Sequence, residues 1–245
     1  MKTIHIYAYA LFIAFLLSSC EGLFFDCHEG NGKLGKEKRY DTDFNEVICE
    51  GSFNVNIEPG EGNKYSIVVE GDNNLLEYIE SMVIDNELHL SLRDDECITP
   101  DYGVTVYVKC PGLQRVVLAG SGDITVSNYL ETQFKASITG SGDIDINNLI
   151  TTSILDLRID GSGDIDASGR AAKAYYTVDG SGNIDAGSTI AKQAFVVIDG
   201  SGDAYVNAVD KISVDIYGSG DVYYNQDVRD DSDISELGSG KAIAR

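Results

Sequence analysis

The chain has 245 residues and is strongly acidic, with 40 Asp and Glu against 18 Lys and Arg and a net charge of −22 at pH 7. This charge disfavours nucleic acids and anionic membrane surfaces as partners, because both would repel it. The sequence has no Trp, the commonest sugar-stacking side chain, and its three histidines, His5, His28 and His89, form no pattern typical of a catalytic triad.

Residues 1–19 are predicted to be a lipoprotein signal peptide. Lys2 precedes an apolar stretch over residues 4–17 that is too short for a comfortable membrane span. The following Leu-Ser-Ser-Cys, residues 17–20, resembles the lipobox of bacterial lipoproteins, so Cys20 would become the acylated first residue of the mature chain. Acyl chains on Cys20 would anchor the protein to a membrane. The alternative is an ordinary signal peptide with a chance cysteine.

Residues 20–39 are predicted to be a tether, because Gly, Asn and charged residues outnumber apolar ones there. Residues 40–245 are then predicted to form one all-β body, since no linker divides them; a separate N-terminal domain is the alternative. We expect 40–112 to be an irregular N-terminal part and 113–245 to be regular.

The irregular part shows period-two alternation of apolar residues, which indicates strands. Gly51-Ser52 is interpreted as a first corner, followed by a strand to Ile57. Residues 74–79 are expected to form one helical turn. Further strands are predicted at Tyr65–Glu70, Met82–Ile84, Glu87–Leu92 and Val104–Lys109.

Four cysteines follow Cys20, and an even number in an exported chain permits two disulfides. Cys97 and Cys110 are the favoured pair, because both lie near the ends of neighbouring predicted strands. Cys27 and Cys49 are the other two. A metal site made by the four cysteines is the alternative, which the absence of any Cys-x-x-Cys spacing disfavours.

The regular part repeats Gly-Ser-Gly-Asp followed by an aliphatic residue, at a period of about 20 residues typical of a solenoid. The fourth copy has Asn183 in place of Asp, and the last has Lys241. The copies begin at Gly120, Gly140, Gly161, Gly180, Gly200, Gly218 and Gly238.

Apolar residues alternate on both sides of each motif, so each coil has at least two short strands with one face inward. Like residues of successive coils would stack about 4.8 Å apart in aliphatic ladders. One predicted ladder contains Leu118, Ile138, Ile159, Val178, Ile198 and Ile216. The fold is therefore predicted to be a parallel β-helix, right-handed by the usual preference for right-handed crossovers.

The Gly-Ser-Gly motif is predicted to turn the corner between strands. Glycine reaches positive φ at little cost, which a sharp bend often needs. The side-chain oxygens of Ser and the following Asp can accept hydrogen bonds from nearby backbone amides.

Stacked coils would bring like-charged Asp residues about 4.8 Å apart, which is unfavourable unless it is offset. In one interpretation each corner Asp accepts backbone hydrogen bonds and the others face water. In the other, Ca²⁺ bridges carboxylates of adjacent coils. The candidate ligands are Asp143, Asp145, Asp164 and Asp166.

The ordered set of motifs resembles the auto-transporter adhesin head GIN domain family (DUF2807), which is common among Bacteroidetes lipoproteins. The matching segments are residues 51–55, 69–76 and 104–108, followed by the Gly-Ser-Gly-Asp-Ile runs. The resemblance implies a β-helical fold, a location in the cell envelope at the outer membrane, facing the periplasm or the surface, and a trimer. It carries over no catalytic residue.

We therefore expect a non-enzymatic, adhesin-like binding or assembly module without a cofactor, whose partners are a glycan, a surface protein or further copies of the chain. Tyr205 and Tyr223 occupy the same outward position in successive coils with Tyr217 beside them, and they are the candidate ligand or subunit surface. Ordinary stacking on a strand face is the alternative for these tyrosines.

The rival class is a Ca²⁺-dependent polysaccharide-binding or polysaccharide lyase β-helix. Its candidate base would be Arg158, predicted to face outward near Asp160, with Arg115 on a neighbouring coil. No long loops interrupt the coils to build a groove, and fold analogy alone does not carry function.

Overall fold

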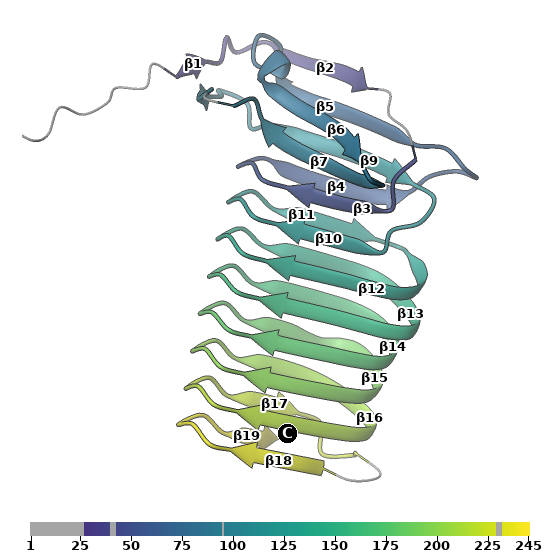
Figure 1. Ribbon diagram of the computed structural model, residues 1–245, viewed down its shortest axis with the longest axis vertical. Coiled ribbons are helices and arrows are strands. Elements are labelled where there is room, and N and C mark those ends of the chain that lie inside the picture. The colour runs from purple at the N-terminus through teal and green to yellow at the C-terminus, as the bar shows by residue number, and fades with distance from the viewer. Residues whose placement is uncertain (1–26, 40–42, 95, 229–231) are drawn as a thin grey trace, which may run out of the picture.

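The computed structural model describes residues 27–39, 43–94, 96–228 and 232–245. They form a column of stacked β coils with an irregular N-terminal end (Figure 1). The predicted signal peptide and Cys20 lie outside the described residues. No helix in the described part of the chain is long and apolar enough to cross a membrane.

The described residues of the first coil and the N-terminal part form nine strands and one short 3-10 helix. They are β1 (His28–Glu29), β2 (Leu34–Arg39), β3 (Glu46–Cys49), β4 (Asn54–Pro59), β5 (Ser66–Asp72), η1 (Leu76–Tyr78), β6 (Ile79–Ile84), β7 (Glu87–Leu92), β8 (Ile98–Thr99) and β9 (Thr105–Cys110). The strands and the helical turn expected in this half are therefore present.

The regular coils follow, and their longer strands continue around a bend. They are β10 (Arg115–Leu118), β11 (Ile124–Ser127), β12 (Leu130–Ile138), β13 (Ile144–Ile159), β14 (Ile165–Val178), β15 (Ile184–Ile198), β16 (Ala204–Ile216), β17 (Val222–Tyr224), β18 (Ser232–Glu236) and β19 (Ala242–Ala244).

Each coil runs along one sheet and returns along a second. We call the first the β11 face: β4, β11, the first halves of β13–β16, β17 and β19. The second is the β10 face: β3, β10, β12, the second halves of β13–β16, and β18. Pairing between the coils is parallel and in register, so Ile124, Ile144 and Ile165 align across β11, β13 and β14. The all-β, parallel solenoid prediction is confirmed.

The core lies between the two faces and consists of aliphatic ladders. The ladder predicted from the alternation is fully buried, each of its members having 0% exposure: Leu118, Ile138, Ile159, Val178, Ile198 and Ile216. Burying apolar surface contributes about 25 cal/mol per Å², and here every coil adds the same set of contacts to its neighbours.

At the N-terminal end, one parallel strand extends each face and antiparallel strands follow it. β9 and β5 continue the β11 face beyond β4, and β2 pairs with β5. β7 and β6 continue the β10 face beyond β3. The expected tether over 20–39 is therefore wrong for its second half: β2 belongs to the main sheet, and β1 pairs with β8.

The corner glycines are required by close stacking of the coils, whereas the sequence predicted that positive φ angles would require them. None of them has a positive φ; the glycines in the left-handed region are Gly32, Gly62 and Gly169. Instead, a Cβ on Gly142 would lie 1.8 Å from the carbonyl oxygen of Gly122 in the coil above. The corners stack so closely that only glycine fits.

The disulfide prediction is also wrong. Cys97 is bonded to Cys27, with Cα atoms 4.5 Å apart, while Cys110 and Cys49 are free and buried. Cys110 points inward from β9, and its Sγ lies 3.2 Å from the hydroxyl of Tyr129. Cys97 lies in the loop before β8, so the two residues do not meet.

Candidate binding surfaces

The corner aspartates form one column of hydrogen bonds. Asp143 N–H donates to Asp123 Oδ1 (3.1 Å), and Asp164 N–H donates to Asp143 Oδ1 (2.7 Å). The same bond recurs in every coil below. The successive acceptors are Asn54, Asp123, Asp143, Asp164, Asn183, Asp203 and Asp221.

The column explains why Asn can replace Asp at two of its positions. Asn54 and Asn183 serve as acceptors in the same way as Asp, because an amide oxygen suffices. Lys241 donates its backbone N–H to Asp221. The repeated corner carboxylates therefore hold coils together, as the hydrogen-bond interpretation expects.

A second acidic ladder, Asp145, Asp166 and Asp185, points outward from the β11 face in register. Burial and the charges of Asp185 and Asp145 raise the pKa of the central carboxyl, Asp166. The described residues include no group of three or more acidic, His or Cys side chains arranged to hold a metal ion. Ca²⁺ binding stays a prediction, to be tested by whether Ca²⁺ shifts the melting temperature.

The acidic ladder is continued by an aromatic one. Tyr205 follows Asp185 in register, and Tyr223 follows Tyr205. The rings of Tyr205 and Tyr223 are stacked, with centroids 4.7 Å apart, and the guanidinium of Arg245 lies 3.7 Å from the Tyr223 centroid. Tyr223 also donates from its hydroxyl to Asp221 Oδ2 (3.2 Å).

The expected pairing of Tyr205 and Tyr223 is therefore present, and Arg245 is a third member that the alternation did not indicate. Tyr217 lies across the corner at Gly218, where 52% of its surface is exposed. The structure thus brings two of the three tyrosines into contact and places the third on the other side of a corner.

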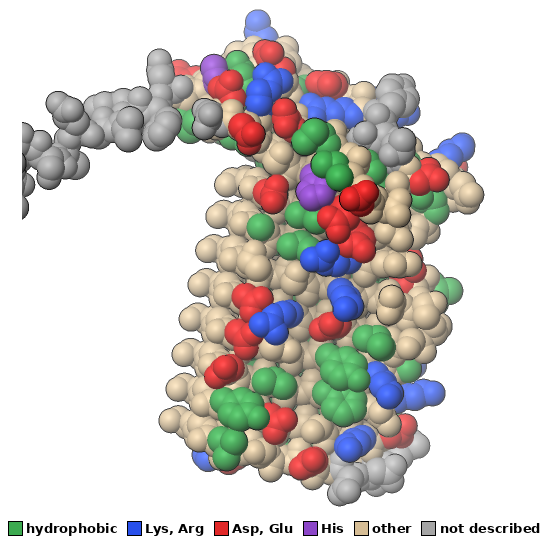
Figure 2. Space-filling model, in the orientation of Figure 1, with side chains coloured by type: hydrophobic (Ala, Val, Ile, Leu, Met, Phe, Trp, Pro, Cys, Tyr) green, Lys and Arg blue, Asp and Glu red, His purple; other side chains and the backbone are tan. Residues whose placement is uncertain are grey.

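A second aromatic pair, which the sequence analysis missed, lies on the β10 face. The rings of Tyr175 on β14 and Phe195 on β15 stack with centroids 5.0 Å apart. Figure 2 shows hydrophobic side chains gathered among Lys and Arg side chains on the lower part of this face. This pair could have been predicted from the alignment of the repeats, because Tyr175 and Phe195 hold equivalent outward positions.

Arg158, the candidate lyase base, is held by carboxylates. Its guanidinium donates to both oxygens of Asp160 (2.9 and 2.7 Å) and to Asp179. The hydrogen bond to Asp160 raises the pKa of Arg158, which disfavours its acting as a base. Arg115 is paired with Glu46 and Glu87.

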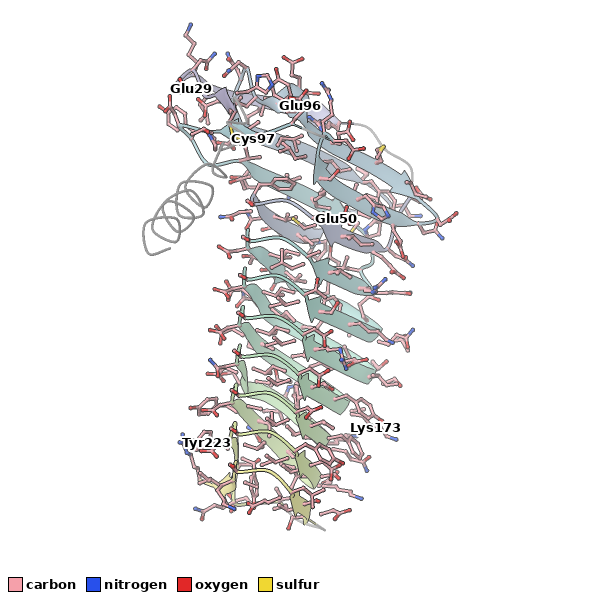
Figure 3. The ribbon with its side chains drawn as sticks, turned by 60° about the vertical axis from the view of Figure 1, so that its left-hand side comes forward. Glu29, Glu50, Glu96, Cys97, Lys173 and Tyr223 are labelled. Carbon is pink, nitrogen blue, oxygen red and sulfur yellow. A yellow bond between two sulfur atoms is a disulfide. The ribbon has the colours of Figure 1, made fainter. Side chains whose placement is uncertain are left out.

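A cavity of about 420 Å³ lies at the N-terminal end of the corner column. Its apolar lining includes Phe53, Leu92, Ile98 and Val104. Glu50, Glu96 and Cys97 are also in the lining, and Figure 3 labels them at this end of the molecule, with Tyr223 near the other end.

The cavity's loop is fastened to the N-terminal segment. Cys97 is bonded to Cys27, and the carboxylate of Glu96 lies 2.8 Å from His28 Nε2. The His28 ring stacks on Tyr78, with centroids 4.1 Å apart. His28 therefore has a structural role and is not part of a tether.

Comparison with known proteins gives one family. The model for "Putative auto-transporter adhesin, head GIN domain" matches residues 43–227. None of the curated proteins matches the sequence.

Several solved structures share the fold. A putative adhesin from Bacteroides fragilis is 24% identical, with a TM-score of 0.82 over 89% of this chain and 99% of its own. A putative lipid binding protein from Parabacteroides distasonis is 22% identical, with a TM-score of 0.72 over 88% and 98%. A putative adhesin from Parabacteroides merdae is 20% identical, with a TM-score of 0.65 over 88% and 98%.

Proposed function

The chain belongs to the auto-transporter adhesin head GIN domain family, and from this premise we propose that it is a non-catalytic binding or assembly module of the cell envelope. The observation that carries the proposal is the aromatic surface on the last coils, which we call the Tyr205–Tyr223 stack: Tyr205, Tyr223 and Arg245. Stacked tyrosines with an arginine are typical of protein and glycan contacts.

The repeated outward side chains of the β11 face suit several weak contacts with one partner. The stack continues the outward ladder of Asp145, Asp166 and Asp185, so a partner lying along the β11 face would meet carboxylates and then aromatic rings. Several such contacts along a rigid column gain strength by avidity. A glycan, a surface protein and a second copy of the chain are the partners that this arrangement suits.

A lipid anchor at Cys20 would complete this role by holding the module at a membrane. The proposal rests on the Leu-Ser-Ser-Cys motif at residues 17–20 behind an apolar stretch. The same motif and the family support an outer-membrane position, facing the periplasm or the surface, as part of this proposal. The lyase alternative is not favoured, because the carboxylates of Asp160 and Asp179 occupy Arg158.

The test replaces Tyr205, Tyr217 and Tyr223 with Ser. The purified variant should show weaker binding to glycan and matrix-protein arrays, or a lower oligomeric state in sedimentation velocity, while its circular dichroism spectrum stays unchanged. A loss of at least about tenfold in affinity, or 1.4 kcal/mol, is expected.

The matched control is Tyr102→Ser with Tyr107→Ser, because these tyrosines are exposed at the opposite end of the molecule. Equal binding by the triple variant and the wild type would contradict the assigned surface. Turnover of an acidic polysaccharide that Arg158→Ala abolishes would instead support the lyase class.

A further inference from the structure

The cavity at the N-terminal end stands where one more corner of the column would be. β7 pairs with β3 and β9 pairs with β4, so the connection between β7 and β9 crosses the corner edge above Gly51. In the next coil, residues 119–123 make this crossing directly. The described residues of this connection, 93–94 and 96–104, instead loop outward, and the space of a corner is left open beneath them.

The edges of this space are closed as in a normal coil. Glu50 N–H donates to Leu90 O (2.9 Å), and Asn54 N–H donates to Val104 O (3.0 Å). Only residues 51–53, between these two bonds, have no corner segment of the described chain stacked above them. The open space therefore matches a segment of about three residues, flanked by bonded strands.

The middle of the corner presents an unused donor. Six corner serines donate their backbone N–H to the first glycine of the coil above: Ser141, Ser162, Ser181, Ser201, Ser219 and Ser239. Ser52 holds the same place at Gly51-Ser52, lines the cavity, and has no acceptor for its N–H among the described residues. In these six corners the acceptor is the carbonyl oxygen of the first glycine above; the N–H of Ser121, below Gly51, makes no such bond.

An apolar surface adjoins that donor. Phe53 replaces the second glycine of the motif, which only a corner with no corner above it can accommodate. Its ring folds over Gly51 and is 4% exposed. Leu92, Ile98 and Val104 complete the apolar lining.

The charge of the cavity excludes anions. Glu50 and Glu96 are in its lining, and of these Glu96 is paired with His28. A carboxylate or phosphate would be repelled, whereas a neutral amide would not be.

We propose that the cavity binds a short, uncharged peptide segment that takes the place of the missing corner, its carbonyl oxygen accepting the Ser52 N–H and its apolar side chain lying against the half-buried Leu92 and Ile98. This site is separate from the Tyr205–Tyr223 stack and does not depend on the function proposed for it. The interaction is the corner-by-corner pairing of the fold, made with a segment from outside the coil.

The experiment titrates the ¹⁵N-labelled protein with the capped peptide acetyl-Gly-Ser-Leu-amide and follows its amide resonances by NMR. Saturable shifts are expected at Ser52, Phe53 and Val104, with none at Tyr205 or Tyr223. N-acetylglucosamine, which carries the same acetamide carbonyl on a sugar, should not compete. Absence of saturable shifts, shifts confined to other residues, or tighter binding of the sugar would each overturn the proposal.

The blocking variant is Gly103→Phe. Gly103 lines the cavity, and a Cβ there meets no atom within 4 Å, so the variant should fold. Its affinity for the peptide should fall at least about tenfold. Ser141→Phe adds the same ring at an exposed corner lower in the column and should bind like the wild type. Equal affinity of Gly103→Phe and Ser141→Phe would show that the cavity is not the site.

Discussion

At the corners, the position of each residue in the stack decides its type. A glycine is required where the carbonyl of the corner above leaves no room for a Cβ. An oxygen acceptor is required where the next coil presents an N–H. Phe53 is permitted in place of the second glycine because no corner of the described residues stacks above it.

Gly142→Ala tests the close stacking of corners. A Cβ would lie 1.8 Å from Gly122 O, and backbone on both sides prevents relief. We expect a loss of more than about 3 kcal/mol in the free energy of unfolding, measured by urea denaturation. Gly103→Ala is the control and should change stability little, because that Cβ meets nothing within 4 Å. A small effect at both positions would refute the steric explanation.

Asp166→Asn tests the acidic ladder. Burial and the neighbouring carboxylates raise the pKa of Asp166 in the folded state. The folded protein therefore holds this proton more tightly than the unfolded chain, and stability is lost as pH rises from the unfolded pKa through the raised folded pKa. The variant should gain about 0.5 kcal/mol at pH 7.

At a pH below the carboxyl's ordinary value the same variant should gain nothing, since Asp166 is then protonated in both states. Melting temperatures at the two pH values decide this. A gain that is independent of pH would mean that the asparagine stabilises through a new hydrogen bond and that charge is not the cause.

Much of the residue pattern could be predicted, because equivalent positions in successive coils of a solenoid have the same surroundings. The buried ladder around Ile159 and the stacking of Tyr205 on Tyr223 both follow from alignment of the repeats. The glycine requirement was assigned to the wrong cause, since sequence alone does not distinguish a backbone angle from a steric contact with another coil. The contact of Arg245 with the stack could not be predicted, because no equivalent arginine occurs in the other coils.

Among the elements, the N-terminal strands differ from the coils in having antiparallel partners. β5 lies between β2 and β9, and β6 forms the edge beside β7. Their residue spans could be predicted from alternation, but their pairing could not, because no repeat relates them. The sequence predicts a tether over β2 (Leu34–Arg39) because this segment is mostly Gly and charged residues. In the structure most of these residues are exposed, as suits an edge strand.

The disulfide joins these N-terminal elements across the sequence. Cys27 and Cys97 are 70 residues apart, so the bond restricts a large loop of the unfolded chain. Cys97→Ser should lower the free energy of unfolding by up to about 4 kcal/mol on the chain-entropy model.

Cys27→Ser and the double variant should lose the same amount as Cys97→Ser, because all three remove one bond. Denaturation of each variant, with the wild type under reducing conditions as a fourth sample, supplies the comparison. Additive losses would show that the two thiols stabilise through separate contacts.

Over the whole molecule, the two ends of the column carry different features. The cavity and the disulfide lie at the N-terminal end, and the Tyr205–Tyr223 stack lies on the last coils (Figure 3). A module anchored through residues preceding Cys27 would hold its cavity toward the anchor and its aromatic surface away from it.

Cys20→Ala tests the anchor. We expect the variant to leave the membrane fraction or to remain unprocessed, since acylation needs the thiol of Cys20. Cell fractionation with mass analysis of the mature N-terminus measures both outcomes. Cys49→Ala, which removes a cysteine buried in the core, is a control for general effects of cysteine loss. Unchanged membrane partition and processing of Cys20→Ala would contradict the lipoprotein assignment.

The hydrogen-bond column has a consequence for how such a protein can change its length during evolution. Every corner accepts from the coil below and donates to the coil above, so any complete coil presents the same two interfaces. Duplication or loss of a whole coil would leave each remaining junction intact, whereas a change of half a coil would exchange the two faces. Relatives should therefore differ in length by whole coils, and the distance from one end to the other should change in steps of about 4.8 Å.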